Sequence, residues 1–502
     1  MPIANTFASL SARAYGFFSS LGKYFISLGT GASTSSFDIL KPVVFNAQDY
    51  DTAGTVSVGK TAWSGLPALS FARYDRNGVV TLQKTVLNGP NLTTYYVTEY
   101  FGAVLFADLI AVVVRVYNAT LTSISYGVQI YLKNSLSYSR SVMFVADPVL
   151  KYAGIFQAVT SSPVAVNTSG LALAGSREVT AISSTTGYSL ASILGITTSG
   201  YTVQYCYAFR RTGVYNNGAF KAIATYLDSS VGYFNFVAGG DGDNNYGVLP
   251  FTTVFKFKAD QPTTWNNISL SASTYNEINR AVDIRVNPES SSGSTSVYVL
   301  SELKNSQSSL RYMDINKLDV YLSHTLGKLV SDPTGTYAIY PRRFVVASTT
   351  GNLYIVADLV SVSSGASLTY ILALDGSLNL LWQRTVAVSL ITSTNAVPVN
   401  TTVGGITIDR YGRLCIAILP INYSPTEIEL VYPTNGIKLG VYRYGPYNGY
   451  SMVIDQASMS IGPTLQTASV TSYTQYTISS PLTTTVRATE IAVTPSSTVT
   501  PI

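Results

Sequence analysis

A strand–turn–strand pattern recurs along most of this chain and constrains its fold more than any other feature. Each copy has an apolar strand, a short polar turn containing Asp, Asn or Gly, and a second strand. The copies begin at Ser70, Tyr126, Tyr188, Val254, Leu310, Tyr370 and Ile428. Successive copies start 56 to 66 residues apart, as expected for one supersecondary unit with its loops. The pattern predicts about seven repeated units.

A second hairpin pattern lies between these copies. It is clearest in GGITIDRYGRLCIAIL from Gly404, and it recurs from Arg343 and Ala281 and more loosely from Phe220 and Phe101. Each unit therefore contains two hairpins, or four strands. A four-stranded sheet with two apolar faces buries both only if similar sheets stack around an axis. The expected fold is all-β, a β-propeller of about seven blades.

The turns and the composition agree with an all-β fold. Asp375-Gly376, Asn77-Gly78, Gly351-Asn352 and Asn435-Gly436 are dipeptides typical of tight hairpins. Tyr occurs 37 times, and charged residues are only 11% of the chain. Tyr, Thr and Val favour strands. The only helix candidate is roughly residues 7–28, where Leu10, Phe17, Leu21 and Phe25 have helix-like spacing.

The two ends differ from the repeated region and divide the chain into three parts. Residues 1–37 are expected to form an N-terminal anchor segment and linker, and residues 38–458 the propeller. Residues 459–502 are a Thr- and Ser-rich C-terminal extended tail. The alternation in TVRATEIAV favours a strand within that tail. It is expected to pack against a neighbouring subunit.

The motif LDGSLNLLWQRTV, followed by GGITIDRYGRLCIAI, resembles the SBBP-type repeat of bacterial seven-bladed β-propellers. FARYDRNGVVTLQKTV and TTGNLYIVADL are similar to its two halves. The resemblance covers roughly residues 40–458 and is weakest in the second and third units. A propeller with this kind of N-terminal segment and Thr-rich tail resembles virion proteins of tailed bacteriophages. The resemblance implies a tail fibre, appendage or head decoration without catalytic residues.

The expected function is therefore that of a structural and adhesive virion protein on the particle surface. The chain has no run of eighteen apolar residues and no convincing signal peptide. The Lys and Arg residues are scattered, with short pairs such as Arg342-Arg343, and do not form the basic patch typical of nucleic-acid binding. Expected partners are other virion proteins, further copies of the chain and a host-surface glycan or protein. A bacterial cell-surface lectin and a polysaccharide-degrading propeller enzyme remain the alternatives.

Few residues support catalysis, and no catalytic residue, cofactor or metal site is predicted. His324 is the only histidine, and Cys206 and Cys415 lie far apart in apolar runs typical of buried thiols. A zinc site or a Ser-His-Asp catalytic triad is therefore disfavoured. The acidic pairs Asp241/Asp243 and Asp49/Asp51 are interpreted as parts of solvent loops, because no later bidentate Glu completes a calcium loop.

Clustered aromatic residues give the only candidate binding site. Tyr442, Tyr444, Tyr447 and Tyr450 lie close together in YRYGPYNGY. Tyr is a common residue of adaptable binding surfaces. The same residues are equally suited to packing the last blade against the first.

Overall fold

The fold was examined in a computed structural model of the chain. It describes residues 23–27, 38–44, 55–63, 66–74, 80–87, 95–118, 124–145, 154–165, 168–180, 187–211, 218–228, 233–242, 251–259, 261–271, 277–287, 295–391, 396–409, 412–421, 427–433, 441–445, 451–458, 464–467, 472–473, 478–483, 487–490 and 497–499.

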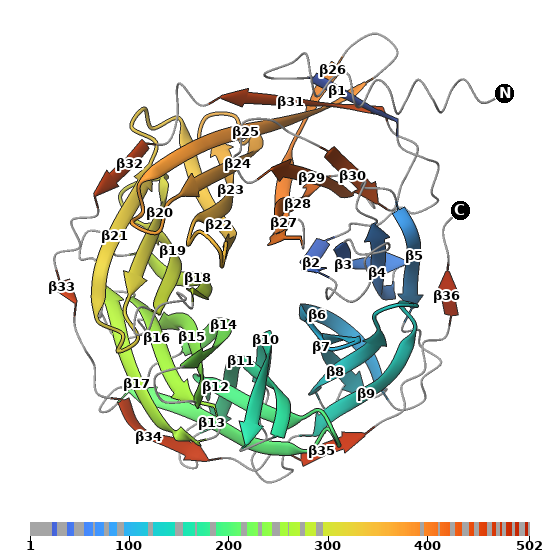
Figure 1. Cartoon of the computed structure of the whole chain (residues 1–502), viewed down its shortest axis with the longest axis vertical. Helices are drawn as coiled ribbons and strands as arrows, with labels where there is room; N and C mark the ends of the chain where they lie inside the picture. The colour runs from blue at the N-terminus through green and yellow to red at the C-terminus, as the bar shows by residue number, and fades with distance from the viewer. Residues whose placement is uncertain are drawn as a thin grey trace.

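Seven antiparallel sheets surround a central axis, each built on four strands that are consecutive in sequence (Figure 1). The first three contain β2 (Asp38–Val44), β3 (Thr55–Trp63), β4 (Leu66–Tyr74) and β5 (Val80–Leu87); β6 (Tyr95–Phe106), β7 (Leu109–Asn118), β8 (Ile124–Leu132) and β9 (Tyr138–Val145); and β10 (Gly154–Ala165), β11 (Thr168–Thr180), β12 (Gly187–Thr197) and β13 (Val203–Arg211). The next two contain β14 (Gly218–Asp228), β15 (Tyr233–Gly242), β16 (Phe251–Lys258) and β17 (Gln261–Ser271); and β18 (Ile278–Asn287), β19 (Ser296–Lys304), β20 (Arg311–Leu318) and β21 (His324–Ser331). The last two contain β22 (Tyr337–Val346), β23 (Leu353–Ser361), β24 (Ser367–Leu374) and β25 (Leu380–Ile391), extended by β26 (Ala396–Val399); and β27 (Thr401–Ile408), β28 (Arg413–Pro420), β29 (Glu427–Pro433) and β30 (Val441–Gly445).

The first strand of each sheet lies nearest the axis. These innermost strands contact one another in the order β2, β6, β10, β14, β18, β22 and β27, and β27 in turn contacts β2. The circle of contacts therefore closes on itself. The expectation of an all-β fold with a propeller arrangement is confirmed.

Apolar side chains fill the spaces between neighbouring sheets. Val356, Ile371 and Ile416, for example, belong to one buried cluster that joins the sheet β22–β25 to the sheet β27–β30. Burying such a side chain contributes on the order of 1.5–3 kcal/mol. Because both faces of a sheet are covered by its neighbours, its middle strands are almost continuously apolar.

Buried polar groups also join the sheets. The Asp358 carboxylate on β23 accepts hydrogen bonds from the Val403 backbone N–H at 2.9 Å and the Thr402 hydroxyl at 2.8 Å, both on β27. Asp283 on β18 accepts one from the Phe344 N–H on β22 at 3.2 Å. Buried polar groups are costly unless they are satisfied, so these bonds favour one alignment of each sheet against the next.

Aspartates cap several of the turns between strands. Asp375 accepts hydrogen bonds from the backbone N–H groups of Ser377 and Asn379, and Asp319 does the same for the residues two and four places after it. The sequence places the special turn residue at Gly376, but the residue with positive φ is Leu378, at 59°. Its side chain is fully buried. Burial therefore outweighs the strain that this backbone conformation imposes on a leucine.

Strands beyond the seventh sheet lie along the rim of the ring (Figure 1). They are β31 (Ser451–Ser458), β32 (Thr464–Thr467), β33 (Ser472–Tyr473), β34 (Ile478–Thr483), β35 (Arg487–Glu490) and β36 (Ser497–Val499). They pair in that order with β25, β21, β17, β13, β9 and β5, each time antiparallel. The C-terminal strands thus return past six sheets of their own chain and cover their outermost edges.

Two local expectations are corrected. Residues 23–27 form strand β1 (Lys23–Ser27), paired with β31, rather than the end of a helix. Asp241 lies in strand β15 rather than in a loop. Glycine permits this strand, because a Cβ on the adjacent Gly240 would lie 2.0 Å from the Ala219 carbonyl oxygen.

Candidate functional site: a cavity lined by bulge residues

Every innermost strand contains a β-bulge at a corresponding position. At this position the register with the second strand of each sheet skips one residue: Leu40, Phe101, Gln157, Lys221, Val282, Arg342 and Gly404. Strands β6 and β10 each have a second register shift, between Val97 and Glu99 and between Pro163 and Ala165. A bulge bends a strand and re-aims the side chain at that point, and bulges are common beside functional sites. The bulges of the innermost strands therefore lie at about the same height along the axis of the ring.

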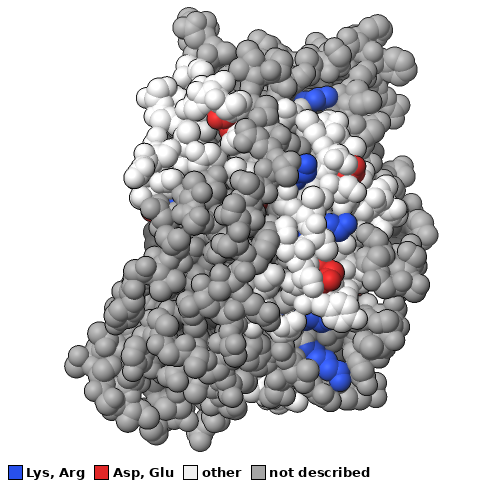
Figure 2. All heavy atoms as spheres, turned by 90° about the vertical axis from the view of Figure 1, so that its left-hand side faces the viewer, with Lys and Arg blue, Asp and Glu red and all other residues white. Residues whose placement is uncertain are grey.

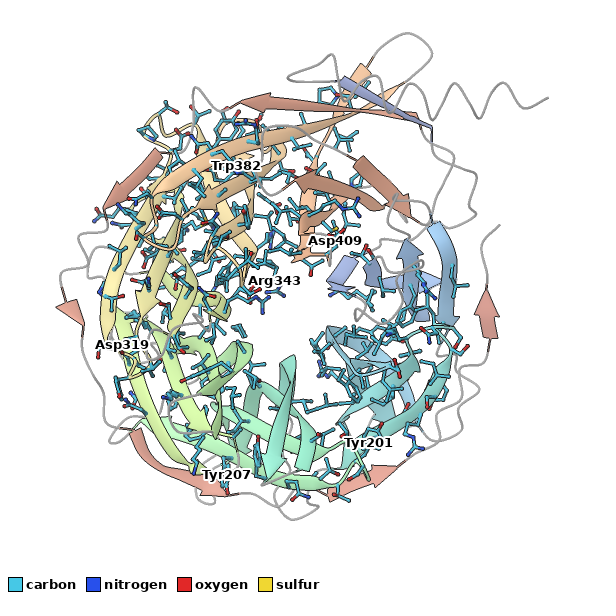
Figure 3. The ribbon with its side chains drawn as sticks, viewed as in Figure 1. Tyr201, Tyr207, Asp319, Arg343, Trp382 and Asp409 are labelled. Carbon is cyan, nitrogen blue, oxygen red and sulfur yellow. The ribbon has the colours of Figure 1, made fainter. Side chains whose placement is uncertain are left out.

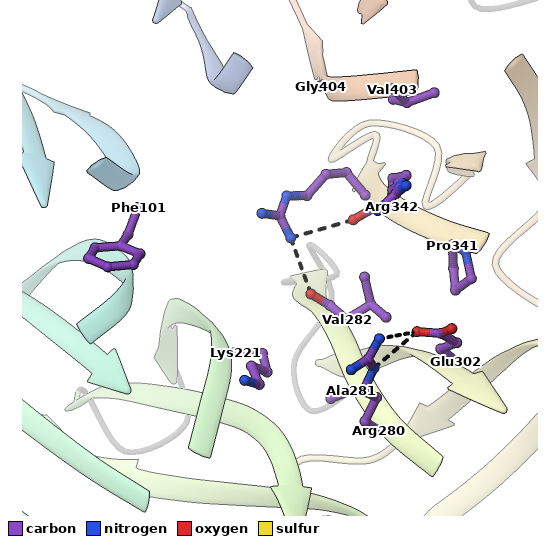
Figure 4. A pocket seen from close by; sticks show the side chains of 11 residues that line it. Phe101, Lys221, Arg280, Ala281, Val282, Glu302, Pro341, Arg342, Val403 and Gly404 are labelled. Atoms are coloured by element: carbon purple, nitrogen blue, oxygen red, sulfur yellow. Dashed lines mark hydrogen bonds and ion pairs between the residues drawn. The ribbon is translucent and has the colours of Figure 1, made fainter. Parts of the chain in front are cut away.

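A cavity of about 390 Å³ lies at this level. Five of the bulge residues line it, together with their neighbours Arg280 and Arg343. In Figure 4, Phe101 lies across the cavity from Arg342, and Lys221 lies on a strand between them. Strands β6, β14, β18, β22 and β27 thus contribute to a single site near the axis.

One acid, Glu302, is enclosed by two arginines. Arg280 donates to Glu302 Oε2 from Nε at 3.0 Å and from Nη2 at 2.7 Å. Arg311 contacts the other carboxylate oxygen. The Glu302 side chain is only 6% exposed, whereas that of Arg280 is 46% exposed. The carboxylate is therefore neutralised from both sides, while one guanidinium remains accessible from the cavity.

A second acid, Asp358, is held by Arg342. The Arg342 Nη2 and Nε atoms lie 2.7 and 2.8 Å from Asp358 Oδ2. Burial raises the pKa of Asp358, although Arg342 and the hydrogen bonds from Thr402 and Val403 act in the opposite direction. The side chain is 3% exposed, whereas that of Arg342 is 43% exposed. Here too the acid faces the protein and the arginine faces the cavity.

Arg343 joins two neighbouring innermost strands beside the cavity (Figure 3). Its Nη1 donates to the carbonyl oxygens of Val282 at 3.2 Å and Arg342 at 3.4 Å. Both acceptors belong to bulge residues, which a bulge leaves out of regular pairing. The contacts orient the guanidinium without adding a negative charge at those atoms.

The cavity lining is positively charged. Among the described residues that line it, Lys221, Arg280, Arg342 and Arg343 are cationic and Glu302 is acidic. On the face in Figure 2, the described Lys and Arg residues are instead interspersed with acids among uncharged residues. A cluster of guanidinium and ammonium groups attracts anions and can hydrogen-bond carboxylate, sulfate or phosphate oxygens.

The tyrosines predicted to bind a ligand are not among the cavity residues. Tyr442 and Tyr444 lie in β30, the outermost strand of its sheet. Tyr447 and Tyr450 lie outside the described residues. The prediction of a tyrosine site therefore remains untested. The cavity that the structure shows lies near the axis of the ring instead of at its rim.

Of the other residues singled out in the sequence, those that the structure describes do not line the cavity. His324 is half-buried on β21, its Nε2 is 3.1 Å from Asn316 Oδ1, and burial lowers its pKa. Cys415 is a buried thiol in β28, and Cys206 lies in β13. Asp49, Asp51 and Asp243 lie outside the described residues.

The described part of the chain holds no candidate metal site and no candidate membrane-spanning helix. No group of three His, Cys, Asp or Glu residues there is placed to hold a metal ion. No described helix is long and apolar enough to cross a membrane.

Sequence reasoning noted Arg342-Arg343 only as a short basic pair and missed Phe101, Lys221 and Arg280. The available signal was the repeat itself. The bulge residues recur at nearly the same interval as the repeat, so aligning the innermost strands would have brought Phe101, Lys221 and Arg342 together.

Comparisons with known proteins gave no family. No family model matches the chain, and no curated protein matches it. Among solved structures, the chain is similar to a mutant of the Bombyx mori GH32 beta-fructofuranosidase in complex with sucrose. That match has a TM-score of 0.27 and 9% sequence identity, and it covers 86% of this chain and 92% of the other.

Proposed function

We propose that this chain is a non-enzymatic adhesive component of a tailed-bacteriophage particle, displayed on the particle surface as a tail fibre, appendage or head decoration. The seven sheets act as seven blades of one propeller, residues 1–37 attach it to the particle, and the tail from residue 459 secures its rim. The propeller binds a host-surface glycan or protein. The observation that carries the binding role is the cavity formed by the repeated bulges.

The two acids bound by cavity arginines, Glu302 and Asp358, favour binding over hydrolysis. Most glycosidases need one carboxylic acid to protonate the leaving group and a second carboxylate as base or nucleophile. Glu302 is held by Arg280 and Arg311, and Asp358 by Arg342. The Glu302 and Asp358 side chains are only 6% and 3% exposed, and arginines occupy their oxygens, so neither carboxylate is free to face a glycosidic bond.

The virion assignment rests on the resemblance of the repeats and of the two ends to phage propeller proteins. A cell-surface lectin would use the same cavity but would be found on bacterial envelopes. A polysaccharide-degrading enzyme would shorten its polymer.

Incubation with host-envelope polysaccharide distinguishes binding from degradation. We expect the purified full chain to co-sediment with host envelopes while solution viscosity and the number of reducing ends stay constant. A steady rise in reducing ends would overturn the non-enzymatic role.

Deletion of residues 1–37 tests the attachment role. We expect the shortened protein to retain envelope binding but to be missing from particles. Normal incorporation of the shortened chain would show that attachment resides elsewhere.

A further inference from the structure

The bulge residues give the cavity a composition suited to one class of ligand. Lys221 and Arg342 are themselves bulge residues, and Arg280 and Arg343 lie within two positions of one. The positive groups thus come from three neighbouring innermost strands, β14, β18 and β22. Such convergence within one cavity creates a focused positive potential.

The acids beside these cationic groups are engaged by arginines. Glu302 is shared between Arg280 and Arg311, and Asp358 is paired with Arg342. Among the described residues that line the cavity, four are cationic and one is acidic. Such a lining is complementary to an anion.

An aromatic side chain, that of Phe101, lines the cavity on the side opposite Arg342 (Figure 4). Phe101 faces the cavity from β6 and is only partly buried against the neighbouring apolar cluster. An exposed aromatic face offers apolar contact to the C–H face of a sugar ring, whereas a simple inorganic anion gains nothing from it. At about 390 Å³, the cavity falls within the range of roughly 300–1,000 Å³ typical of small-molecule sites.

We propose that this cavity binds an acidic sugar unit of an anionic polysaccharide, with Lys221, Arg280 and Arg343 contacting its carboxylate or sulfate and Phe101 contacting its ring. This inference rests on the proposed binding function and names the class of receptor. Arg342 mainly positions the site, because it also neutralises the buried Asp358.

Titration calorimetry with defined oligosaccharides tests the proposal. The probes are a trigalacturonate, a sulfated galactotriose and neutral galactotriose, with sodium sulfate as the small-anion control. We expect the charged trisaccharides to bind, the neutral one to bind at least about tenfold more weakly, and added salt to weaken binding. Failure of both charged trisaccharides to bind would overturn the inference, and so would equal affinity for the neutral one. Equal affinity for sodium sulfate would show a site for small anions instead of a sugar.

Three variants assign the binding to this cavity. Lys221→Gln and Arg343→Gln each remove one positive charge, and Phe101→Leu removes the aromatic face. Lys221→Gln and Arg343→Gln are each expected to weaken trigalacturonate binding about tenfold, the scale of one charged hydrogen bond. Phe101→Leu is expected to weaken it about fivefold, the scale of one aromatic contact. Arg140→Gln is the matched control, because Arg140 is an exposed residue of β9, and its affinity should stay within about twofold. Unchanged affinity in all three cavity variants, with melting temperatures like that of the parent chain, would place the binding elsewhere.

This outcome is separable from the virion assignment. If the protein is present on particles but binds neither charged probe, only the acidic-sugar inference fails. If it binds acidic sugars but is found on cell envelopes, the ligand class stands and the virion role fails.

Discussion

Asp314 provides a quantitative test of the packing between sheets. It lies on β20, is 6% exposed, and accepts a hydrogen bond from Asn316 Nδ2 at 2.6 Å. Its Oδ1 atom has no hydrogen-bond partner among the described residues. Burial raises the pKa of Asp314 from 3.8 to about 6, against the lowering effect of its bonds to Asn316 and Ile315. Keeping this carboxylate ionised therefore lowers the stability of the folded protein.

The effect on stability follows from the direction of this shift. Because the folded-state pKa exceeds the unfolded value, the folded state holds more protons between these two pH values, and its stability falls as pH rises through that window. A shift of about two units corresponds to about 3 kcal/mol at pH 7. Most of this destabilisation is absent at pH 4, where the buried carboxyl group is protonated.

Asp314→Asn removes the titration while keeping an oxygen that can accept from Asn316. Guanidinium denaturation at pH 4 and pH 7 should show the stability of the variant, relative to the parent, rising by about 2–3 kcal/mol between the two. Any cost of the neutral amide is common to both pH values and cancels in this comparison.

Asp375→Asn is the matched control with the opposite sign. Hydrogen bonds from Asn379 and Ser377 and the charge of Lys317 lower the pKa of Asp375 despite some desolvation. Its carboxylate therefore stabilises the fold above the unfolded pKa, and this contribution is lost as pH falls through the folded pKa. That variant should lose stability relative to the parent as pH rises. A pH-independent difference for Asp314→Asn would refute the reasoning about Asp314.

Three further predictions concern the cavity wall, the turns and the rim. Arg342→Met should destabilise the fold by about 3 kcal/mol, because it leaves the buried Asp358 without its cation, and adding Asp358→Asn should recover most of that loss in denaturant titrations. Leu378→Ala should lower the free energy of unfolding by about 2–5 kcal/mol, because buried apolar surface is lost. Leu378→Gly should lower it by about 1 kcal/mol less, because glycine relieves the positive φ. A glycine variant less stable than the alanine variant would contradict the explanation of this turn. Deleting residues 459–502 should expose the outer edges of β5, β9, β13, β17 and β21 and promote association through them; a shortened chain that stays monomeric in light scattering at the same concentration as the parent would show that the rim strands do not protect these edges.

The repeated hairpins could be predicted because their apolar strands and polar turns are local features. β22–β23 and β24–β25, for example, correspond to the patterns found from Arg343 and Tyr370. The hairpins β2–β3 and β10–β11 were missed, since β3, β10 and β11 are rich in Ser, Thr and Ala and neither hairpin carries a clear turn dipeptide. Composition alone does not separate such strands from loops.

The cavity could not be predicted from any single strand, because a bulge is a property of the pairing between strands. Nothing local to Lys221 or Phe101 shows that the register skips these residues. The turn at Leu378 was missed for a different reason, since local preference predicts glycine at positive φ and a tertiary contact decides otherwise. The tail was expected to contain a strand, but its partner edges exist only once the ring has formed.

Antibody labelling of purified particles, together with mass spectrometry of their proteins, tests the proposed function most directly. We predict that an antibody against the propeller labels an appendage or the surface of tailed particles, and that peptides of this chain are found in them. Absence from particles, with the protein recovered on bacterial envelopes, would contradict the virion role and favour a cell-surface lectin.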